Sequence, residues 1–251
     1  MKFKCISCDA LARQVYMCAA SSPHLIDVEL VSMGQHIKPK ELNKTVQDKI
    51  DSVTDETYDA ILLCYGLCGQ ATAGLAARGI PVVMPRAHDC ITLCLGSKEE
   101  YKKQQTKCPG TIWYTKDYME RLDNASGYSG MGASTYEPYD EKEYSAMVGR
   151  MGKERADRII ASMSDMTKHY ERIVFIEQDI VDCTKEEELV LREAESKGWR
   201  FEKMKGDIRL IKSLLNGEWP DDDYLRIGPG QRITVGFGDR IVRIAENEDN
   251  N

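Results

Sequence analysis

The sequence lacks the features of several common classes of protein. Nowhere do about 18 apolar residues run together, as a membrane-spanning helix would need, and the first residues contain no apolar segment of signal-peptide length. Long unbroken blocks of lysine and arginine are also missing, and the formal net charge is −7 with a pI near 5.3. Because binding to nucleic acid depends on a basic surface, we expect neither nucleic acid nor a membrane as a partner. We expect a cytoplasmic location.

Metal and cofactor motifs based on histidine are scarce as well. His24, His36 and His169 stand singly, without the spacing of metal ligands, and we expect them at the surface or in packing. No Asp-x-His-x-x-Gly signature of corrinoid ligation is present, so we do not expect this chain itself to carry cobalamin.

The composition is that of a folded protein. Hydrophobic residues make up 42% of the 251 residues and charged residues 30%, which is typical of soluble globular proteins. This length allows a substantial core in one large α/β domain or in two small lobes.

Predicted strands and helices alternate through the first half of the chain. Strands are predicted at residues 1–7, 26–34, 58–66 and 80–85, and helices at residues 9–22, 38–53, 72–78 and 89–105. This order predicts an α/β fold, with a parallel Rossmann-like sheet and helices on both of its faces.

The middle of the chain breaks this rhythm. An edge strand is predicted near residues 109–115, and residues 126–145 are rich in Gly, Ser, Tyr and acids without a regular period. Long loops of this kind often act as lids or interface arms. We therefore expect one α/β lobe at 1–125, a loop or lid at 126–145, and a second α/β lobe at 146–251, unless the chain forms one continuous domain.

Three of the nine cysteines follow predicted strands of the first lobe. Cys8 follows the first strand, Cys68 the third and Cys90 the fourth. The carboxyl ends of parallel strands lie at one edge of a sheet, where ligands bind in open α/β folds. Three soft thiolate ligands would meet there, as a metal ion or an iron–sulfur cluster requires.

The remaining cysteines have a simpler interpretation. Free cysteine often behaves as a small buried hydrophobe, so packing is an alternative for every one of them. Cys64, Cys94 and Cys18 are expected in the core, and Cys183 is a less certain fourth ligand. Whether Cys5, Cys64, Cys94 or Cys183 joins the site stays open, and Cys108 has no evident partner.

Several other residues accompany the cysteines. His88 and Asp89 directly precede Cys90, and Asp89 is favoured as the residue that caps the following helix. His88 could bind a metal or donate a proton, and Arg86 could hold an anionic substrate or pair with Asp89. Gly66 and Gly69 flank Cys68, where glycine lets the backbone turn sharply and approach a ligand.

Two of these segments resemble a known family. "YGLCGQATAGL" at residues 65–75 and "PRAHDCITLCLGSKEEY" at residues 85–101 are similar to the signature segments of the family called domain of unknown function 1638. The matching positions are Tyr65, Gly66, Cys68, Gly69, His88, Asp89, Cys90 and Gly96. The resemblance implies anaerobic one-carbon metabolism, because such proteins are often encoded near corrinoid-dependent methyltransferases. We take Tyr65, Gly66 and Gly69 as candidate cofactor-binding residues.

Two hypotheses of function follow. In the first, Cys8, Cys68 and Cys90 hold a metal, with a [4Fe–4S] cluster favoured over zinc, and act on a small-molecule substrate with help from Arg86, His88 and Asp89. In the second, the protein is a noncatalytic accessory that binds a corrinoid protein or methyltransferase through residues 128–144, and its cysteines are structural. An oligomer is compatible with either hypothesis.

Overall fold

The computed structural model describes residues 1–53, 57–121, 130–132, 141–159 and 169–245. The chain forms two compact units, and each is described by itself. The first contains residues 1–102, 178–182 and 205–251, and the second contains residues 103–177 and 183–204. This division differs from the predicted lobes, because residues 205–251 belong with the N-terminal segment.

The first unit is built on a five-stranded sheet with the order β2-β1-β3-β4-β8. Its members are β1 (Lys2–Cys8), β2 (Leu25–Val31), β3 (Ala60–Cys64), β4 (Val82–Pro85) and β8 (Tyr224–Ile227). The strands β2, β1, β3 and β4 are parallel, whereas β8 runs antiparallel to β4. All five residues of β3 are buried, as expected for a central strand that is covered on both faces. The predicted parallel α/β fold is confirmed.

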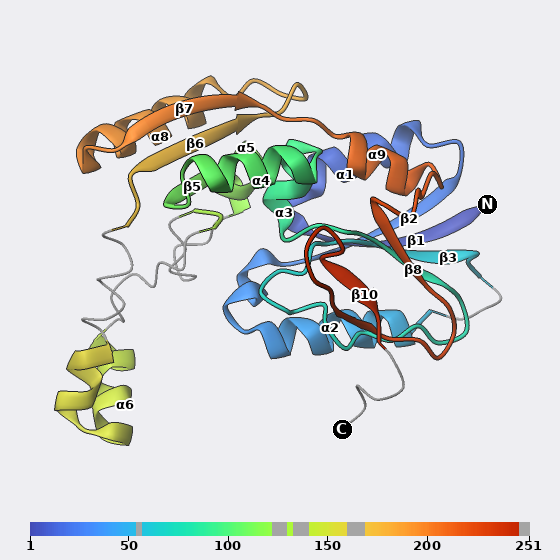
Figure 1. The fold of residues 1–251 in the computed structure, drawn as a ribbon, viewed down its shortest axis with the longest axis horizontal. Helices are drawn as coiled ribbons and strands as arrows, with labels where there is room; N and C mark the ends of the chain where they lie inside the picture. Colours follow the sequence, from blue (N-terminus) through green and yellow to red (C-terminus); the bar gives the residue numbers. More distant parts are fainter. Residues whose placement is uncertain (54–56, 122–129, 133–140, 160–168, 246–251) are drawn as a thin grey trace. The chain divides into compact units, whose positions relative to one another are not determined.

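Helices cover both faces of this sheet. After the short 3-10 helix η1 (Asp9–Leu11), α1 (Ala12–Ser21) lies with α9 (Arg209–Leu215) on one face, and α2 (Pro39–Asp51) lies on the other (Figure 1). In α2 the buried residues Leu42, Val46 and Ile50 recur every four residues, which places them on one side of the helix. A hairpin of β9 (Ile233–Val235) and β10 (Val242–Ile244) also belongs to this unit.

The predicted helix at residues 72–78 is wrong. These residues form turns and an isolated bridge between Ala76 and Arg232. The side-chain amide of Asn43 in α2 donates to the carbonyls of Ala71 and Ala73, both at 2.8 Å. Hydrogen bonds from a distant helix thus satisfy backbone groups that a helix would have satisfied locally.

The predicted helix at residues 89–105 is two helices. They are α3 (Cys90–Leu95) and α4 (Lys98–Lys107), and Gly96 between them has a left-handed φ of 68°. A Cβ atom at Gly96 would lie 2.6 Å from the carbonyl oxygen of Asp207. Only glycine fits this turn without a shift of the backbone.

The second unit contains a three-stranded sheet with the order β5-β6-β7. The strand β5 (Thr111–Tyr114) is an edge strand, as predicted, and is parallel to β6 (Arg172–Glu177), while β7 (Arg200–Lys205) follows α8 (Thr184–Lys197). Two further helices of this part of the chain are α5 (Lys116–Arg121) and α6 (Glu141–Met151). Most of the predicted loop at 126–145 lies outside the described residues, and α6 begins within it.

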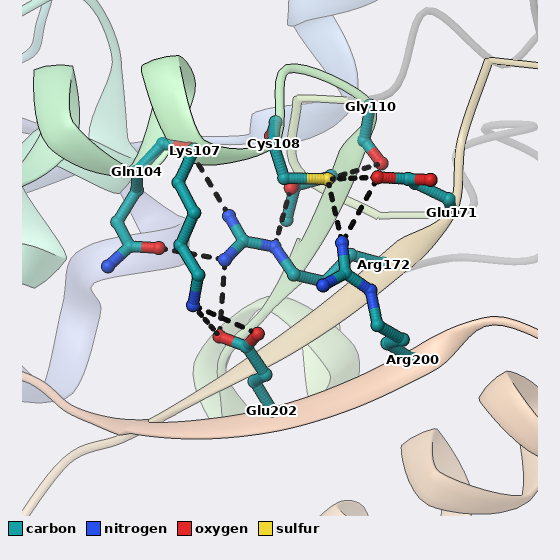
Figure 2. A network of polar contacts seen from close by, with 9 residues as sticks. Gln104, Lys107, Cys108, Gly110, Glu171, Arg172, Arg200 and Glu202 are labelled. Carbon is teal, nitrogen blue, oxygen red and sulfur yellow. Dashed lines mark hydrogen bonds and ion pairs between the residues drawn. The ribbon is translucent and has the colours of Figure 1, made fainter.

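A buried arginine holds the second unit together. Arg172 on β6 is 0% exposed, and its guanidinium donates to the side chains of Thr111 and Gln104, both at 2.8 Å. It also forms an ion pair with Glu202 at 3.1 Å (Figure 2). These contacts join α4, β5, β6 and β7 around one charge.

Cys108 takes part in the same region. Its sulfur donates a hydrogen bond to the carboxylate of Glu171 at 3.2 Å, and Arg200 binds that carboxylate at 3.0 Å (Figure 2). The sequence suggested no partner for Cys108, and the structure shows that it binds Glu171. Among the helices of the described chain, none has the length and apolar character needed to span a membrane.

Candidate functional site

The three cysteines predicted as ligands belong to segments that end neighbouring strands of the first unit. Cys8 is the last residue of β1, Cys68 follows β3, and Cys90 begins α3 after β4. The strands β1, β3 and β4 are adjacent and parallel. The chain first adds β2 on one side of β1 and then β3 on the other, so the strand order reverses at this edge. In open α/β sheets this is the position where ligands bind.

The loops that follow β3 and β4 are hydrogen-bonded to each other. The backbone N–H groups of Leu67 and Cys68 donate to the carbonyls of Ala87 and His88, both at 2.8 Å. Gly66 makes the approach possible, because a Cβ atom there would lie 2.5 Å from the backbone nitrogen of Asp89. Glycine was expected here so that the backbone could approach a ligand closely. In the structure, Gly66 approaches the backbone of the neighbouring loop instead.

Cys68 lies in an unusual backbone conformation. Its φ is 47°, and Gly69 and Gln70 follow with φ values of 62° and 74°. Left-handed conformations cost a residue other than glycine on the order of 1–3 kcal/mol, and such strain is concentrated at functional sites. The sharp turn expected at Gly69 is present, and the left-handed conformation also includes Cys68 and Gln70.

The environment of the Cys68 sulfur combines opposing influences. Burial raises the pKa of the Cys68 thiol well above its usual value, and the neighbouring charges of Asp89 and Cys8 raise it further. Hydrogen bonds to the sulfur from the backbone N–H groups of Gly66 and Cys90 act in the other direction, because they stabilise a thiolate.

The three thiols also affect one another. Burial is the main cause of the raised pKa of Cys90, and the charges of Cys8 and Cys68 add to it. The sulfurs therefore lie near enough for their charges to interact. Within the part of the chain that the structure describes, however, no group of three His, Cys, Asp or Glu side chains could hold a metal ion as placed.

Asp89 caps α3, as the sequence predicted. Its carboxylate accepts a hydrogen bond from the backbone N–H of Thr92 at 3.1 Å and another from the hydroxyl of Tyr101 at 2.9 Å. Burial raises the pKa of Asp89 above its ordinary value, although these hydrogen bonds oppose the rise. His88 is exposed and stacks on the ring of Tyr101, with ring centres 5.4 Å apart.

Arg86 has contacts of a structural kind. It is 9% exposed, and its guanidinium donates to the backbone carbonyls of Asp221, at 2.8 Å, and Val242. Its own backbone N–H donates to the carbonyl of Asp223. These contacts tie the C-terminal part of the chain to β4, whereas the sequence suggested substrate binding or a pair with Asp89.

Most other cysteines of the first unit are core residues. Burial raises the pKa of Cys5 to about 12 and that of Cys18 to about 11, and it raises the pKa of Cys64 still further above its usual value. Cys94 is 1% exposed. The core positions predicted for Cys18, Cys64 and Cys94 are confirmed. Cys183 belongs to the second unit.

Three polar side chains at the same sheet edge were missed or undervalued. The sequence points to Tyr65 only through the family resemblance, it predicts His36 at the surface or in packing, and no pattern points to Gln35. The rings of His36 and Tyr65 stack with centres 6.3 Å apart. One signal was available, because Gln35 and His36 directly follow the strand predicted at residues 26–34, whose end lies at the carboxyl edge of a parallel sheet.

Fold and site together define an α/β protein with a Rossmann-like parallel sheet, whose carboxyl edge carries interacting thiols and a buried tyrosine. The chain belongs to the family described as protein of unknown function (DUF1638), whose model matches residues 30–215. The matched range contains Cys68 and Cys90 but not Cys8. No curated protein and no solved structure shows a match to the chain.

Proposed function

We propose that this protein is a thiolate-ligated iron–sulfur protein of anaerobic one-carbon metabolism, with Cys8, Cys68 and Cys90 as cluster ligands. The observation that carries the proposal is the convergence of these three thiols at the carboxyl ends of neighbouring parallel strands, near enough for their charges to interact. Three thiols that repel one another as thiolates need a compensating cation to be deprotonated together, and a metal supplies it.

We favour a cluster over a single zinc ion because all three candidate ligands are thiols. Zinc would require its cysteine donors to lie about 2.3 Å from one point. In a [4Fe–4S] cluster each cysteine binds a different iron atom, so the sulfurs can stand further apart. Backbone N–H groups that point at a cysteine sulfur, as at Cys68, are typical of cluster sites and tune their potential.

The neighbouring residues would support this site in different ways. With three protein ligands, the cluster would keep one iron open for a small-molecule substrate and supply Lewis-acid or electron-transfer chemistry. In this proposal Asp89, whose pKa is raised by burial and which accepts a hydrogen bond from Tyr101, would exchange a proton near Cys68. His88 is accessible beside it. Arg86 would act only by holding β4 to the C-terminal segment.

The test is metal analysis of protein purified without oxygen. Wild type, Cys68→Ser and Cys90→Ser are compared for iron, sulfide and zinc per chain and for the visible spectrum. Both variants should lose most of their iron, because a hydroxyl is a poor replacement for a soft thiolate. Cys18→Ser is the matched control, since Cys18 is a buried thiol of the same unit, and it should keep its iron.

The same experiment decides between this proposal and an accessory protein with structural cysteines. The burial of Cys8, at 2% exposed, favours that second candidate, because a packed thiol needs no metal. In that case all variants would contain equal metal, and each would lose a modest stability of about 1–3 kcal/mol. A corrinoid protein or methyltransferase would then be sought as the partner.

A further inference from the structure

A buried tyrosine hydroxyl lies at the sheet edge that carries Cys8, Cys68 and Cys90. Tyr65 directly follows β3, is 1% exposed, and its hydroxyl has no hydrogen-bond partner among the described residues. Burial raises the pKa of Tyr65 well above its usual value, and the charges of Cys8, Cys68, Cys64 and Asp9 raise it further. The phenol is therefore protonated and lies within reach of the charges of the cysteine site. An unsatisfied buried hydroxyl is costly, so it indicates a partner that is not part of the chain.

Two neighbouring side chains share this property. The Nε2 atom of His36 and the Oε1 atom of Gln35 are likewise buried without a partner within the described ranges. His36 stacks on Tyr65 with an angle of 19° between the rings. Burial lowers the pKa of His36 to about 4, so its imidazole is neutral near pH 7.

The short helix that carries His36 is fixed to the end of β1. This helix, η2 (Met33–Ile37), donates a hydrogen bond at its start, from the backbone N–H of Met33 to the carboxylate of Asp9 at 2.8 Å. The hydroxyl of Ser32 accepts from the backbone N–H of Gly34 at 3.3 Å. The three unpartnered atoms are thus held at the edge where β1, β2 and β3 end.

We propose that Tyr65, His36 and Gln35 form a recognition subsite for a small uncharged molecule with N–H or O–H donors, of the amide class, bound beside the cysteines. This inference rests on the proposed function in one respect: it assigns the molecule to the same site as the proposed iron–sulfur cluster. The subsite offers an amide oxygen, a neutral imidazole and a phenol, and none of them is a cation. An anion would therefore find no opposite charge among these three side chains.

Acetamide and acetate provide a matched pair of probes. They have almost the same shape, but only acetamide is uncharged and carries N–H donors. Binding to the full-length protein is measured by ligand-observed NMR titration. Acetamide should bind more tightly than acetate by about tenfold or more, as expected for one lost hydrogen bond and one buried charge. Equal binding of the two, tighter binding of acetate, or no binding of acetamide would overturn the proposal.

The variant Tyr65→Phe tests the residue itself. It removes only the hydroxyl and keeps the ring that stacks on His36, so acetamide affinity should fall about fivefold to tenfold. Thermal stability should be unchanged or higher, because an unpartnered buried oxygen is removed. A loss of stability with unchanged affinity would instead show a purely structural hydroxyl.

Two controls separate this inference from the metal proposal. Tyr58→Phe removes an exposed hydroxyl that donates to Asp27 at 2.8 Å, and it should leave acetamide affinity unchanged. Cys68→Ser should lose iron but keep acetamide binding, because the three subsite atoms remain. If acetamide did not bind, the iron content measured for the wild type would still test the cluster proposal. The two proposals can therefore be rejected independently.

Discussion

Gly66 occupies a position between β3 and the cysteine loop where the absence of a side chain decides the structure. A Cβ atom there would meet the backbone of Asp89 and of His88, which cannot move away as a flexible side chain could. The hydrogen bonds between the two loops therefore depend on one residue type. Cys68 and Cys90 are carried on these loops, so their separation is set at Gly66.

The substitution Gly66→Ala tests this dependence. We expect a loss of unfolding free energy of about 1–3 kcal/mol, as for other overpacked positions. Iron content should fall as well if the cysteines are cluster ligands, since the loops must separate. Urea denaturation measures the first quantity, and anaerobic metal analysis measures the second.

Gly34→Ala is the control for this change. A Cβ atom at Gly34 would meet only the hydroxyl of Ser32, at 3.5 Å, which is an ordinary contact. Stability should stay within about 1 kcal/mol of wild type. If both variants were equally stable, the contact between Gly66 and Asp89 would not constrain the site.

At this scale the sequence predicted the candidate site in part. Cys8, Cys68 and Cys90 could be found because each follows an apolar run, and the N-cap role of Asp89 follows from residue type and position. Arg86 could not be interpreted correctly, because its carbonyl partners are more than 130 residues away along the chain. A packing role was among the predictions for His36, but its particular partner Tyr65 could not be predicted, because their stacking is a tertiary contact.

Among the elements, the helix α4 and the strands β5, β6 and β7 meet at the buried guanidinium of Arg172 (Figure 2). The side chain also lies 5.7 Å from the ring centre of Trp113, as measured from its Cζ atom. A fully buried charge is tolerated only where hydrogen bonds and an opposite charge compensate for lost hydration. The network therefore holds α4 against the sheet and also fixes which residues of α4 face Arg172.

Replacement of this charge should destabilise the second unit. For Arg172→Met we expect a loss of about 2–4 kcal/mol, somewhat below the range for a fully orphaned partner, because Lys107 still pairs with Glu202. Arg200→Met is the comparison, since the pair of Arg200 with Glu171 is largely exposed and should contribute at most about 1 kcal/mol. Equal losses in urea denaturation would contradict a special role of Arg172.

The elements also show where sequence patterns stop being informative. Buried strands such as β3 and amphipathic helices such as α2 carry their own periodic signal. The turn at residues 72–78 does not, because its helix-like composition is overridden by hydrogen bonds from Asn43. The strand β8 was not predicted at all, since four residues are too few for a period and its pairing with β4 is remote in sequence.

For the whole molecule, the first unit depends on both ends of the chain. The strand β8 and the helix α9 come from the C-terminal segment and pack on elements from the first hundred residues. The predicted boundary near residue 125 would separate these parts. Sequence patterns suggest consecutive lobes, whereas compactness in space does not require continuity along the chain.

A truncated chain tests the discontinuous unit. Residues 1–125 alone lack β8, α9 and the carbonyl partners of Arg86, so we expect this fragment to be unfolded or aggregated. Circular dichroism and size-exclusion chromatography would show it, with the full-length chain as control. A monomeric fragment with a cooperative urea transition would contradict the assignment of residues 205–251 to this unit.

The pairing of β4 with β8 has a consequence for synthesis on the ribosome. The residues of β4 leave the exit tunnel long before Tyr224–Ile227 are translated, so this edge of the parallel sheet has no strand beside it until those residues emerge. Unpaired edges of apolar strands invite association with other nascent chains. Emergence of Tyr224–Ile227 from the tunnel is therefore the event that closes the sheet, and a chaperone that shields Val82–Pro85 until then would raise the yield of folded protein.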